Sequence, residues 1–187
     1  MSQVLASSVK EYLDQLGSGS AVPGGGSAAA VAGAMGVSLL AMVARISARK
    51  TGDSPDGSRL LELVPELDEL RARLGRLSQD DIDAYRGVID ARKRGALPAD
   101  LERAYEHAAE VPLETARAAD RGLAIFTEVS RSAWEMTRSD LDAGRALLDV
   151  SLKVALANVA VNLPELAEPG RVKLEREYAE LAARRRQ

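Results

Sequence analysis

The chain contains no cysteine and only one histidine, His107, among its 187 residues. The absence of cysteine excludes disulfides, thiolate zinc sites and cysteine nucleophiles. A single histidine leaves little basis for a histidine-dependent catalytic triad. Any chemistry must therefore come from carboxylates, amides, hydroxyls and the backbone.

Aromatic residues are also scarce, at 3% of the chain, whereas hydrophobic residues reach 46% and charged residues 28%. A composition rich in Ala, Leu and Val favours closely packed helices over a sheet of β-branched and aromatic residues. A formal charge of -3 gives no electrostatic reason to expect nucleic acid as a partner. We predict one all-α domain over residues 1–187, built as a multi-helix bundle.

Charge is absent from residues 16–44, which is long enough to span a bilayer as a helix. A membrane-associated helix is therefore one interpretation. A buried helix fits better, because the first third is rich in Gly, Ser and Pro and the rest is Ala/Gly-rich. Ala29, Gly33 and Gly36 would let another backbone approach closely, either inside the bundle or at a subunit interface. The N-terminus lacks a signal-peptide pattern, so we expect a cytoplasmic protein without membrane partners.

Hydrophobic periodicity and turn residues predict seven helical segments separated by Gly- and Pro-containing breaks. Ser27 is the expected N-cap of the second helix, and Ser139 or Asp140 that of the sixth. Pro112 should kink the fourth segment. The expected segments are residues 2–16, 27–49, 59–94, 98–122, 123–136, 139–163 and 171–187.

Asp81 interrupts an otherwise apolar seam in the third segment, where leucines recur every three or four residues. A carboxylate buried on such a seam loses hydration, and its pKa rises toward the range useful for acid–base catalysis. A hydrogen bond or ion pair between helices would explain the same position equally well. Both interpretations stay open from spacing alone.

Asn158 and Asn162 are the only asparagines in the chain and lie four residues apart, on one face of the sixth segment. Asp140 falls near the same azimuth. Polar groups on an inward face need partners, so the asparagines either bond each other and backbone carbonyls or form the wall of a ligand site.

Gly24, Gly25 and Gly26 precede Ser27 directly before a helix, where backbone N–H groups can bind an anion. The pattern lacks the lysine of a P-loop and the strand of a dinucleotide site. A tight turn without a ligand is the simpler interpretation.

Taken together, four motifs in this order resemble the cyclodeaminase domain of formiminotransferase-cyclodeaminase and its free-standing relatives, including methenyltetrahydrofolate cyclohydrolases. The resemblance covers about residues 4 to 165. It implies an all-α bundle that forms a homodimer. The motifs are Pro23-Gly24-Gly25-Gly26-Ser27 with its helix, Asp81-Ile82-Asp83-Ala84-Tyr85, Ala109-Glu110-Val111-Pro112-Leu113, and Ser139-Asp140-Leu141 leading to Asn158-Val159-Ala160-Val161-Asn162-Leu163.

The resemblance implies a tetrahydrofolate substrate carrying a formimino or methenyl carbon, with no metal or redox cofactor. Asp81 then corresponds to the general acid–base. Asn158 and Asn162 would contact the pterin or the bridging carbon, and Asp140 the pterin. The glycine loop from Gly24 to Ser27, together with Lys50, would receive the anionic benzoylglutamate end.

One departure from the family pattern precedes Ser139. Relatives commonly carry a glycine–asparagine pair there, whereas this chain has a stretch containing the bulky Trp134, which could reshape the pocket. The resemblance does not separate a cyclodeaminase from a cyclohydrolase. It also leaves open a non-catalytic helical dimer that binds folate or a protein partner.

Overall fold

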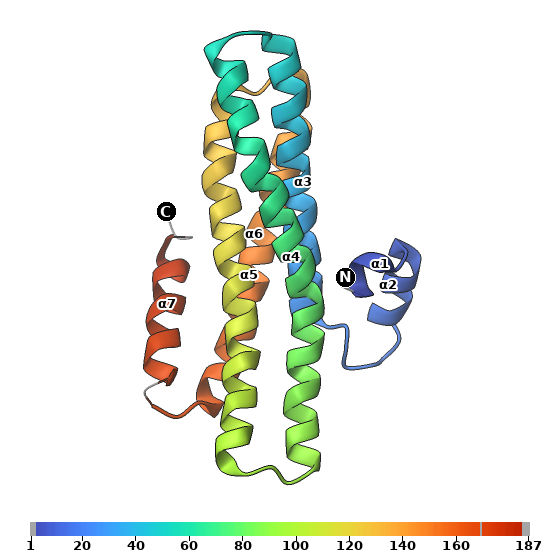
Figure 1. Ribbon diagram of the computed structural model, residues 1–187, viewed down its shortest axis with the longest axis vertical. Helices are drawn as coiled ribbons and strands as arrows, with labels where there is room; N and C mark the ends of the chain where they lie inside the picture. The colour runs from blue at the N-terminus through green and yellow to red at the C-terminus, as the bar shows by residue number, and fades with distance from the viewer. Residues whose placement is uncertain (1–2, 169, 185–187) are drawn as a thin grey trace.

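The computed structural model describes residues 3–168 and 170–184, and in these residues every regular element is helical. The predicted all-α class is therefore confirmed. Four long helices form a bundle, and shorter helices lie beside it (Figure 1). The long helices are α3 (Gly25–Thr51), α4 (Pro55–Lys93), α5 (Pro98–Ser132) and α6 (Arg138–Asn162); the short ones are α1 (Gln3–Ala6), α2 (Val9–Leu16) and α7 (Gly170–Arg184), with 3-10 turns η1 (Glu135–Thr137) and η2 (Leu163–Glu165).

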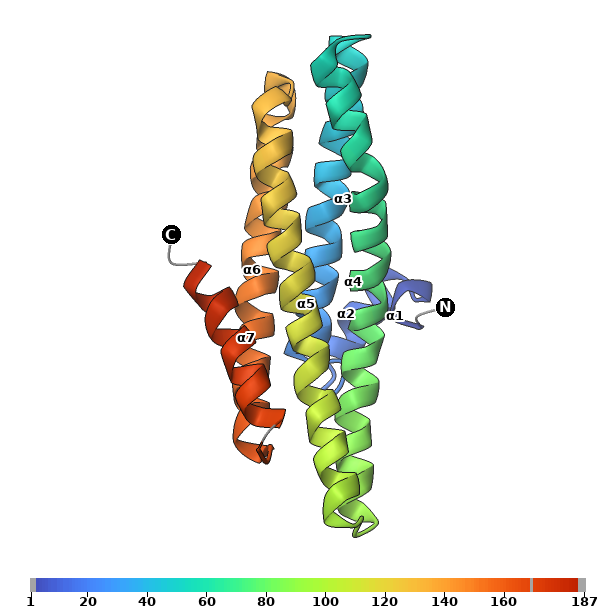
Figure 2. The ribbon, with the colours of Figure 1, turned by 60° about the vertical axis from the view of Figure 1, so that its left-hand side comes forward.

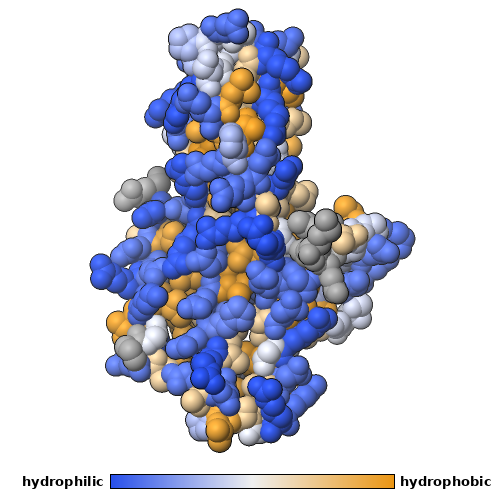
Figure 3. All heavy atoms as spheres, viewed as in Figure 1, coloured by the Kyte–Doolittle hydropathy of each residue, from blue (hydrophilic) through white to orange (hydrophobic). Residues whose placement is uncertain are grey.

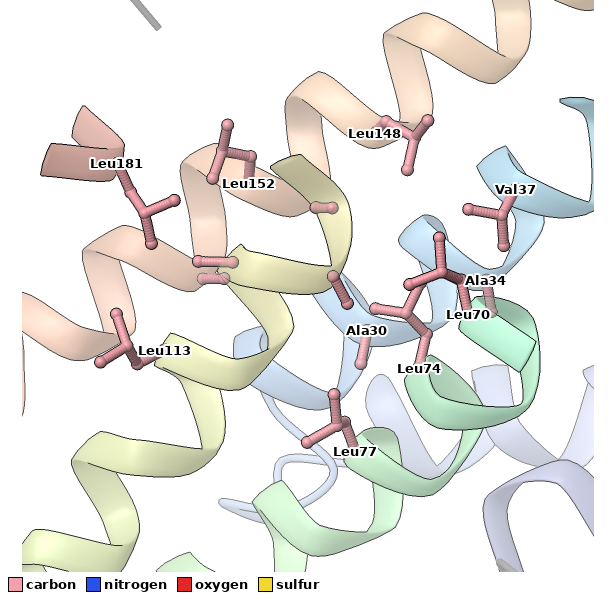
Figure 4. Packing of buried hydrophobic residues seen from close by; sticks show 14 of the residues in the cluster. Ala30, Ala34, Val37, Leu70, Leu74, Leu77, Leu113, Leu148, Leu152 and Leu181 are labelled. Atoms are coloured by element: carbon pink, nitrogen blue, oxygen red, sulfur yellow. The ribbon is translucent and has the colours of Figure 1, made fainter. Parts of the chain in front are cut away.

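The long helices run antiparallel in sequence order, with α3 packed against α4 and α6, and α5 packed against the same two helices. Helix α7 lies along the outside of α5 (Figure 2). Leucine and alanine side chains from all of these helices fill the centre, and Leu181 joins α7 to the core (Figure 4). Their burial removes apolar surface from water, which is the main stabilising contribution to such a bundle.

Glycines let α3 and α6 approach each other closely, as the small-residue spacing predicted. A Cβ at Gly33 would overlap the Ser151 side chain. A Cβ at Gly36 would lie 2.8 Å from Cγ of Leu148 and 2.9 Å from the Gly144 carbonyl oxygen. The distance between these two helices therefore depends on the absence of side chains at both glycines.

The outward side of α3 remains apolar and open. It forms a groove of about 680 Å³ next to α4, and Met35 in this groove is 54% exposed. Helix α3 is therefore apolar on both sides. One side packs inside the bundle, and the other is an exposed apolar face. The groove is lined by Val31, Ala34, Met35, Ser38, Leu39, Met42, Arg71 and Ala72.

Two helical stretches of the described chain are long and apolar enough to cross a membrane by length and composition: Gly25–Thr51, with mean hydropathy 1.9, and Glu135–Glu165, with 1.5. Core helices of bundles have the same properties, and 61% of the first window is buried in the fold. Hydrophilic side chains cover most of the face seen in Figure 3, where α4 and α5 lie in front. This face is predominantly hydrophilic.

The first residues of several helices differ from the predicted ones. The expected helix 2–16 is two helices, because Ser8 is the N-cap of α2 and forms a capping box with Glu11. Helix α3 begins at Gly25, with Gly24 as N-cap, so Ser27 is not the N-cap. Helix α6 begins at Arg138, with Thr137 rather than Ser139 or Asp140 in the N-cap position.

Two long helices contain an internal proline, and one predicted helix boundary is absent. Ser54 caps α4 at Pro55, four residues before the predicted start at residue 59, and Pro65 lies inside the helix. Helix α5 continues through Pro112 to Ser132, so the expected segments 98–122 and 123–136 are one helix. Proline removes one backbone hydrogen bond, and packing along the rest of a long helix offsets that local cost.

Ion pairs between α4 and α5 repeat every seven residues on both helices. Arg59 pairs with Glu128, Glu66 with Arg121, and Arg73 with Glu114. Each pair is solvent-accessible and contributes little to stability on its own. The regular spacing reflects the antiparallel register of the two helices. The same register brings the C-terminal part of α4 beside the N-terminal part of α5.

Candidate active site

A pocket of about 430 Å³ lies where α3 begins and α6 ends, between these ends, the C-terminal part of α4 and the N-terminal part of α5. Its volume falls within the usual range for small-molecule sites. Asp81, Asn158 and Asn162 all line it. The complete lining is Ala21, Val22, Gly24, Gly25, Gly26, Asp81, Ala84, Tyr85, Val88, Ile89, Arg92, Tyr105, Ala108, Asn158, Val161, Asn162 and Glu165.

Asp81 caps the first turn of α3 from the neighbouring helix. Gly24, the N-cap residue, has no side chain to satisfy the free N–H groups of that turn. Oδ2 of Asp81 accepts a hydrogen bond of 2.8 Å from the backbone N–H of Ser27, the third residue of α3. The anion held at this helix N-terminus is thus a carboxylate of the protein itself.

Two opposing effects set the protonation of Asp81. Burial raises the pKa of Asp81 above its ordinary value of 3.8, and the hydrogen bond from Ser27 lowers it by a smaller amount. The net direction is upward, so the carboxyl holds its proton to higher pH than an exposed aspartate. A carboxyl whose pKa is raised in this way, facing a pocket, is suited to act as a general acid–base.

No residue larger than glycine fits at position 26, because a Cβ there would overlap the carboxylate of Asp81. Gly25 is less restricted, since its Cβ would sit 3.8 Å from Nδ2 of Asn158. The glycine turn therefore brings the backbone of α3 against Asp81 on one side and near Asn158 on the other.

Ser27 links the helix turn next to the pocket to the N-terminal helices. The residue is fully buried, and its hydroxyl lies 3.1 Å from the hydroxyl of Tyr12 on α2. Burial raises the pKa of Tyr12, which favours the neutral phenol in this contact. The N-terminal helices are therefore tied to the residue that positions Asp81.

Asn158 and Asn162 bond to backbone carbonyls, as one interpretation of their spacing predicted, and they also line the pocket, where a ligand role stays a prediction. Nδ2 of Asn158 donates to the carbonyl of Val154, and Nδ2 of Asn162 donates to the carbonyls of Asn158 and of Ala108 on α5. Their side-chain carbonyl oxygens make no hydrogen bond within the described chain. The amino groups thus fix the side chains, and the carbonyl oxygens remain available to a ligand.

Lys50 and Asp140 lie at the other end of the bundle. Lys50 is in the last turn of α3, about 37 Å along the axis from Gly25 at 1.5 Å per residue, and its Nζ lies 4.7 Å from the centre of the Trp134 ring. Asp140 is in the first turn of α6. Neither lines the pocket within one protomer, so their roles as substrate contacts stay predictions. Trp134 is at this end as well and does not shape the pocket.

Four polar pocket residues were not singled out from the sequence as ligand contacts: Tyr85, Arg92, Tyr105 and Glu165. Tyr85 and Arg92 follow Asp81 at positions 4 and 11 further along α4, which places all three on one face. That spacing was the available signal. Tyr105 and Glu165 come from other helices, and no pattern within α4 predicts them.

Tyr105 is buried, and its hydroxyl has no hydrogen-bond partner in the described chain. The guanidinium of Arg92 lies 5.3 Å from the centre of its ring. The described residues contain no group of three or more His, Asp or Glu side chains arranged to hold a metal ion.

Comparison with known proteins points in one direction. Residues 8–180 match the family model described as formiminotransferase-cyclodeaminase. The chain is 30% identical over 164 residues to the methenyltetrahydrofolate cyclohydrolase of Methylorubrum extorquens, covering 82% of this chain and 78% of that protein. It is 27% identical over 174 residues to the mouse formimidoyltransferase-cyclodeaminase, covering 88% of this chain and 32% of that protein, so it spans about a third of the longer enzyme.

The fold also has a close counterpart among solved structures. The crystal structure of formiminotetrahydrofolate cyclodeaminase from Thermotoga maritima superposes with a TM-score of 0.92. The match covers 98% of this chain and 92% of that one, at 27% sequence identity. Bundle architecture and sequence thus point to the same group of proteins.

Proposed function

The chain belongs to the formiminotransferase-cyclodeaminase family, and from this premise we propose that it is a one-carbon folate enzyme acting on 5,10-methenyltetrahydrofolate. It would form this compound as a formimidoyltetrahydrofolate cyclodeaminase or hydrolyse it as a methenyltetrahydrofolate cyclohydrolase. Relatives carrying both names match the chain, and the proposal covers both directions.

The observation that carries the proposal is the position of Asp81. This partly buried carboxyl lines the pocket together with two amide side chains and is held by the N–H of Ser27. Both reactions pass through a tetrahedral carbon between two nitrogens, and both need protons moved between water or nitrogen and an acid–base group. One tuned carboxyl surrounded by neutral amides meets that requirement.

In the hydrolytic direction, water adds to the methenyl carbon and loses a proton to the Asp81 carboxylate. The bond from that carbon to N5 then breaks as N5 takes this proton from Asp81. The hydroxyl of the intermediate loses its remaining proton to water as the carbonyl forms, so a formyl group stays on N10 and one proton is released overall. In the cyclodeaminase reaction, N10 attacks the formimino carbon while protonated Asp81 gives its proton to the imine nitrogen. The Asp81 carboxylate then takes the proton from N10 and passes it to the amino group, and the bond from the carbon to that nitrogen breaks to release ammonia and leave the methenyl cation. Amide oxygens of Asn158 and Asn162 would accept hydrogen bonds from N–H groups of the pterin.

No metal or redox cofactor takes part in the proposed chemistry, because neither reaction changes an oxidation state and proton transfer alone completes each step. We place the reaction in the cytoplasm. A protein that partitions into the aqueous phase without detergent after lysis would agree with this location, and one recovered only with detergent would contradict it.

We also propose that the chain forms a homodimer through the exposed apolar face of α3. The groove lined by Val31, Met35 and Leu39 is flanked by one charged residue, Arg71, and belongs to the most apolar helix of the bundle. A second copy of this helix would cover the groove with a matching apolar surface, as a two-fold interface requires. The same face would explain why α3 carries more apolar residues than one bundle can bury.

The test measures loss of the methenyl chromophore when purified protein meets 5,10-methenyltetrahydrofolate, beside a buffer blank and a folded Asp81→Asn variant. Wild type should exceed the blank, and the variant should lose about 10²- to 10⁴-fold in kcat/KM. A second assay with 5-formiminotetrahydrofolate follows methenyl formation and ammonia release. Whichever assay shows turnover decides between the two reactions.

Null results in both assays would overturn the enzymatic proposal. Tight folate binding without turnover would then favour the alternative, a non-catalytic helical dimer of this fold. Equal activity in wild type and Asp81→Asn would keep the substrate assignment and remove Asp81 from the chemistry.

A further inference from the structure

One face of α4 lines the pocket and carries a carboxylate, Asp81, and a guanidinium, Arg92. Asp81, Tyr85, Val88 and Arg92 are spaced by four, three and four residues, so they form a single stripe along the helix, and all four line the pocket. The Cα atoms of Asp81 and Arg92 are about 16 Å apart along the axis at 1.5 Å per residue. The pocket is therefore elongated, with Asp81 near one end and Arg92 near the other.

Arg92 is the only lysine, arginine or histidine among the described residues that line this pocket. Lys50, the cation expected from the sequence, lies at the far end of the bundle. An anionic group of a ligand that enters the pocket beside Asp81 thus meets one fixed positive charge, and that charge belongs to Arg92.

The arginine is held in place but is not tightly paired. Its guanidinium carbon lies 5.3 Å from the centre of the Tyr105 ring, a geometry that is favourable for a cation over an aromatic face. Its ion pair with Glu165 spans 3.9 Å between Nη2 and Oε2, beyond hydrogen-bond distance, and both side chains are about half exposed. Its N–H donors therefore remain available for a stronger acceptor.

From this arrangement we propose that Arg92 binds a carboxylate of the substrate's glutamate tail and that Tyr105 positions its guanidinium. The inference rests on the proposed folate substrate. In a folate, the glutamate carboxylates lie roughly 10 Å beyond N10, from bond lengths of about 1.3–1.5 Å. Helical side chains lean toward the N-terminus, and the Arg92 side chain is longer than that of Asp81, so its guanidinium can extend along the pocket toward Asp81.

The ion-pairing geometry also explains the presence of Glu165. A bound carboxylate would form charge-assisted hydrogen bonds with the fork of N–H groups on Arg92, and these are stronger than the long contact with Glu165. Glu165 is a loose counter-ion of Arg92, at 3.9 Å. Binding would replace it without moving the helix backbone.

The experiment compares two stable ligands by isothermal titration calorimetry at pH 7: 5-formyltetrahydrofolate and its tetrahydropteroate counterpart, which lacks the glutamate. Wild type should bind the glutamate-bearing ligand about tenfold to a hundredfold more tightly. Arg92→Gln should abolish this preference while leaving binding of the pteroate ligand unchanged, which also shows that the variant is folded. Arg86→Gln on the same helix, outside this pocket, should keep the wild-type preference.

Tyr105 is tested through the same preference. Tyr105→Phe keeps the ring and should retain the preference, whereas Tyr105→Leu removes the ring and should reduce it about threefold to tenfold. An unchanged preference in Tyr105→Leu would overturn the positioning role.

The remaining outcomes distinguish failure of the Arg92 assignment from failure of the folate proposal. If wild type binds both ligands equally, or if Arg92→Gln keeps the preference, the assignment of Arg92 is overturned and the folate proposal stands. If wild type binds neither ligand, the folate proposal fails, and the assignment of Arg92 fails with it.

Discussion

The backbone N–H of Ser27 and the Oδ2 atom of Asp81 are joined by a hydrogen bond of 2.8 Å that links the first turn of α3 to the C-terminal half of α4. A glycine N-cap leaves this N–H without a local acceptor, and the carboxylate of Asp81 takes that role. The same carboxylate faces the pocket. One contact therefore helps to hold the helix end and orients the proposed acid–base.

Replacing Asp81 by Asn should increase stability at neutral pH while removing activity. Burial raises the pKa of Asp81 in the folded state, and Asn can still accept the Ser27 hydrogen bond without a buried charge. Urea unfolding at pH 7 should give a higher midpoint for Asp81→Asn than for wild type. A lower midpoint would mean that the ionised carboxylate stabilises the fold.

The pH dependence of this difference has a definite sign. Below the ordinary value of 3.8, Asp81 is protonated in both folded and unfolded chains. Between 3.8 and the raised pKa, the unfolded chain loses its proton first, so the contribution of Asp81 to stability decreases as pH rises. The advantage of Asp81→Asn should grow across this window and then stay constant. Unfolding curves from pH 4 to 8 test this, and a difference that shrinks with pH would contradict it.

Gly26→Ala should lower kcat/KM by at least about tenfold, because the new Cβ would overlap the Asp81 carboxylate and displace it from the Ser27 N–H. Loss of that hydrogen bond should cost about 1 kcal/mol of unfolding free energy. The matched control is Gly87→Ala on α4, where no atom lies within 4 Å of the added Cβ. That control should keep full activity and gain up to about 1 kcal/mol from better helix propensity. Equal kinetics in both variants would show that the position of Asp81 tolerates displacement.

Gly36→Ala should destabilise the fold by about 1–3 kcal/mol without changing the pocket directly, because its Cβ would press against Leu148 and the Gly144 carbonyl of α6. Thermal and urea unfolding, with Gly87→Ala measured in parallel, report this effect. Wild-type stability in Gly36→Ala would mean that α3 and α6 can separate at little cost.

Met35→Glu should convert the proposed dimer into monomers, because it places a charge in the centre of the apolar groove on α3. Leu61→Glu is a matched control, since both side chains are 54% exposed in one protomer and Leu61 lies outside the groove. Size-exclusion chromatography with light scattering should show a dimer for wild type and for Leu61→Glu. A monomeric wild type, or a dimeric Met35→Glu, would exclude this interface.

Sequence patterns predicted the helical class and much of the site because both depend on local spacing. Asp81 on an apolar seam and Asn158 with Asn162 on one helix face are properties of a period of 3.6 residues. Their convergence with Gly24–Gly26 agrees with the resemblance noted in the sequence. The predicted boundary between residues 122 and 123 was wrong, because local signals do not show how much packing a continuous helix gains.

Axial position was the main quantity that periodicity could not supply. Asp140 shares an azimuth with Asn158, but it lies about 27 Å away along α6 at 1.5 Å per residue. Lys50 is likewise separated from the glycine turn by the whole of α3. Tyr105 and Glu165 enter the pocket from α5 and η2, and only the tertiary register between helices brings them near Arg92.

The hairpin of α4 and α5 extends beyond the start of α3 and the end of α6 (Figures 1 and 2). Arg92 and Tyr105 both belong to this projecting part, whereas Asp81 lies level with the glycine turn of α3. Insertions or deletions of whole turns near the hairpin tip would change the depth of the pocket and leave the shared four-helix core intact. Evolution can therefore adjust which ligand tails are accepted separately from the acid–base group, and a chimaera that exchanges only this hairpin with a relative should transfer tail preference alone.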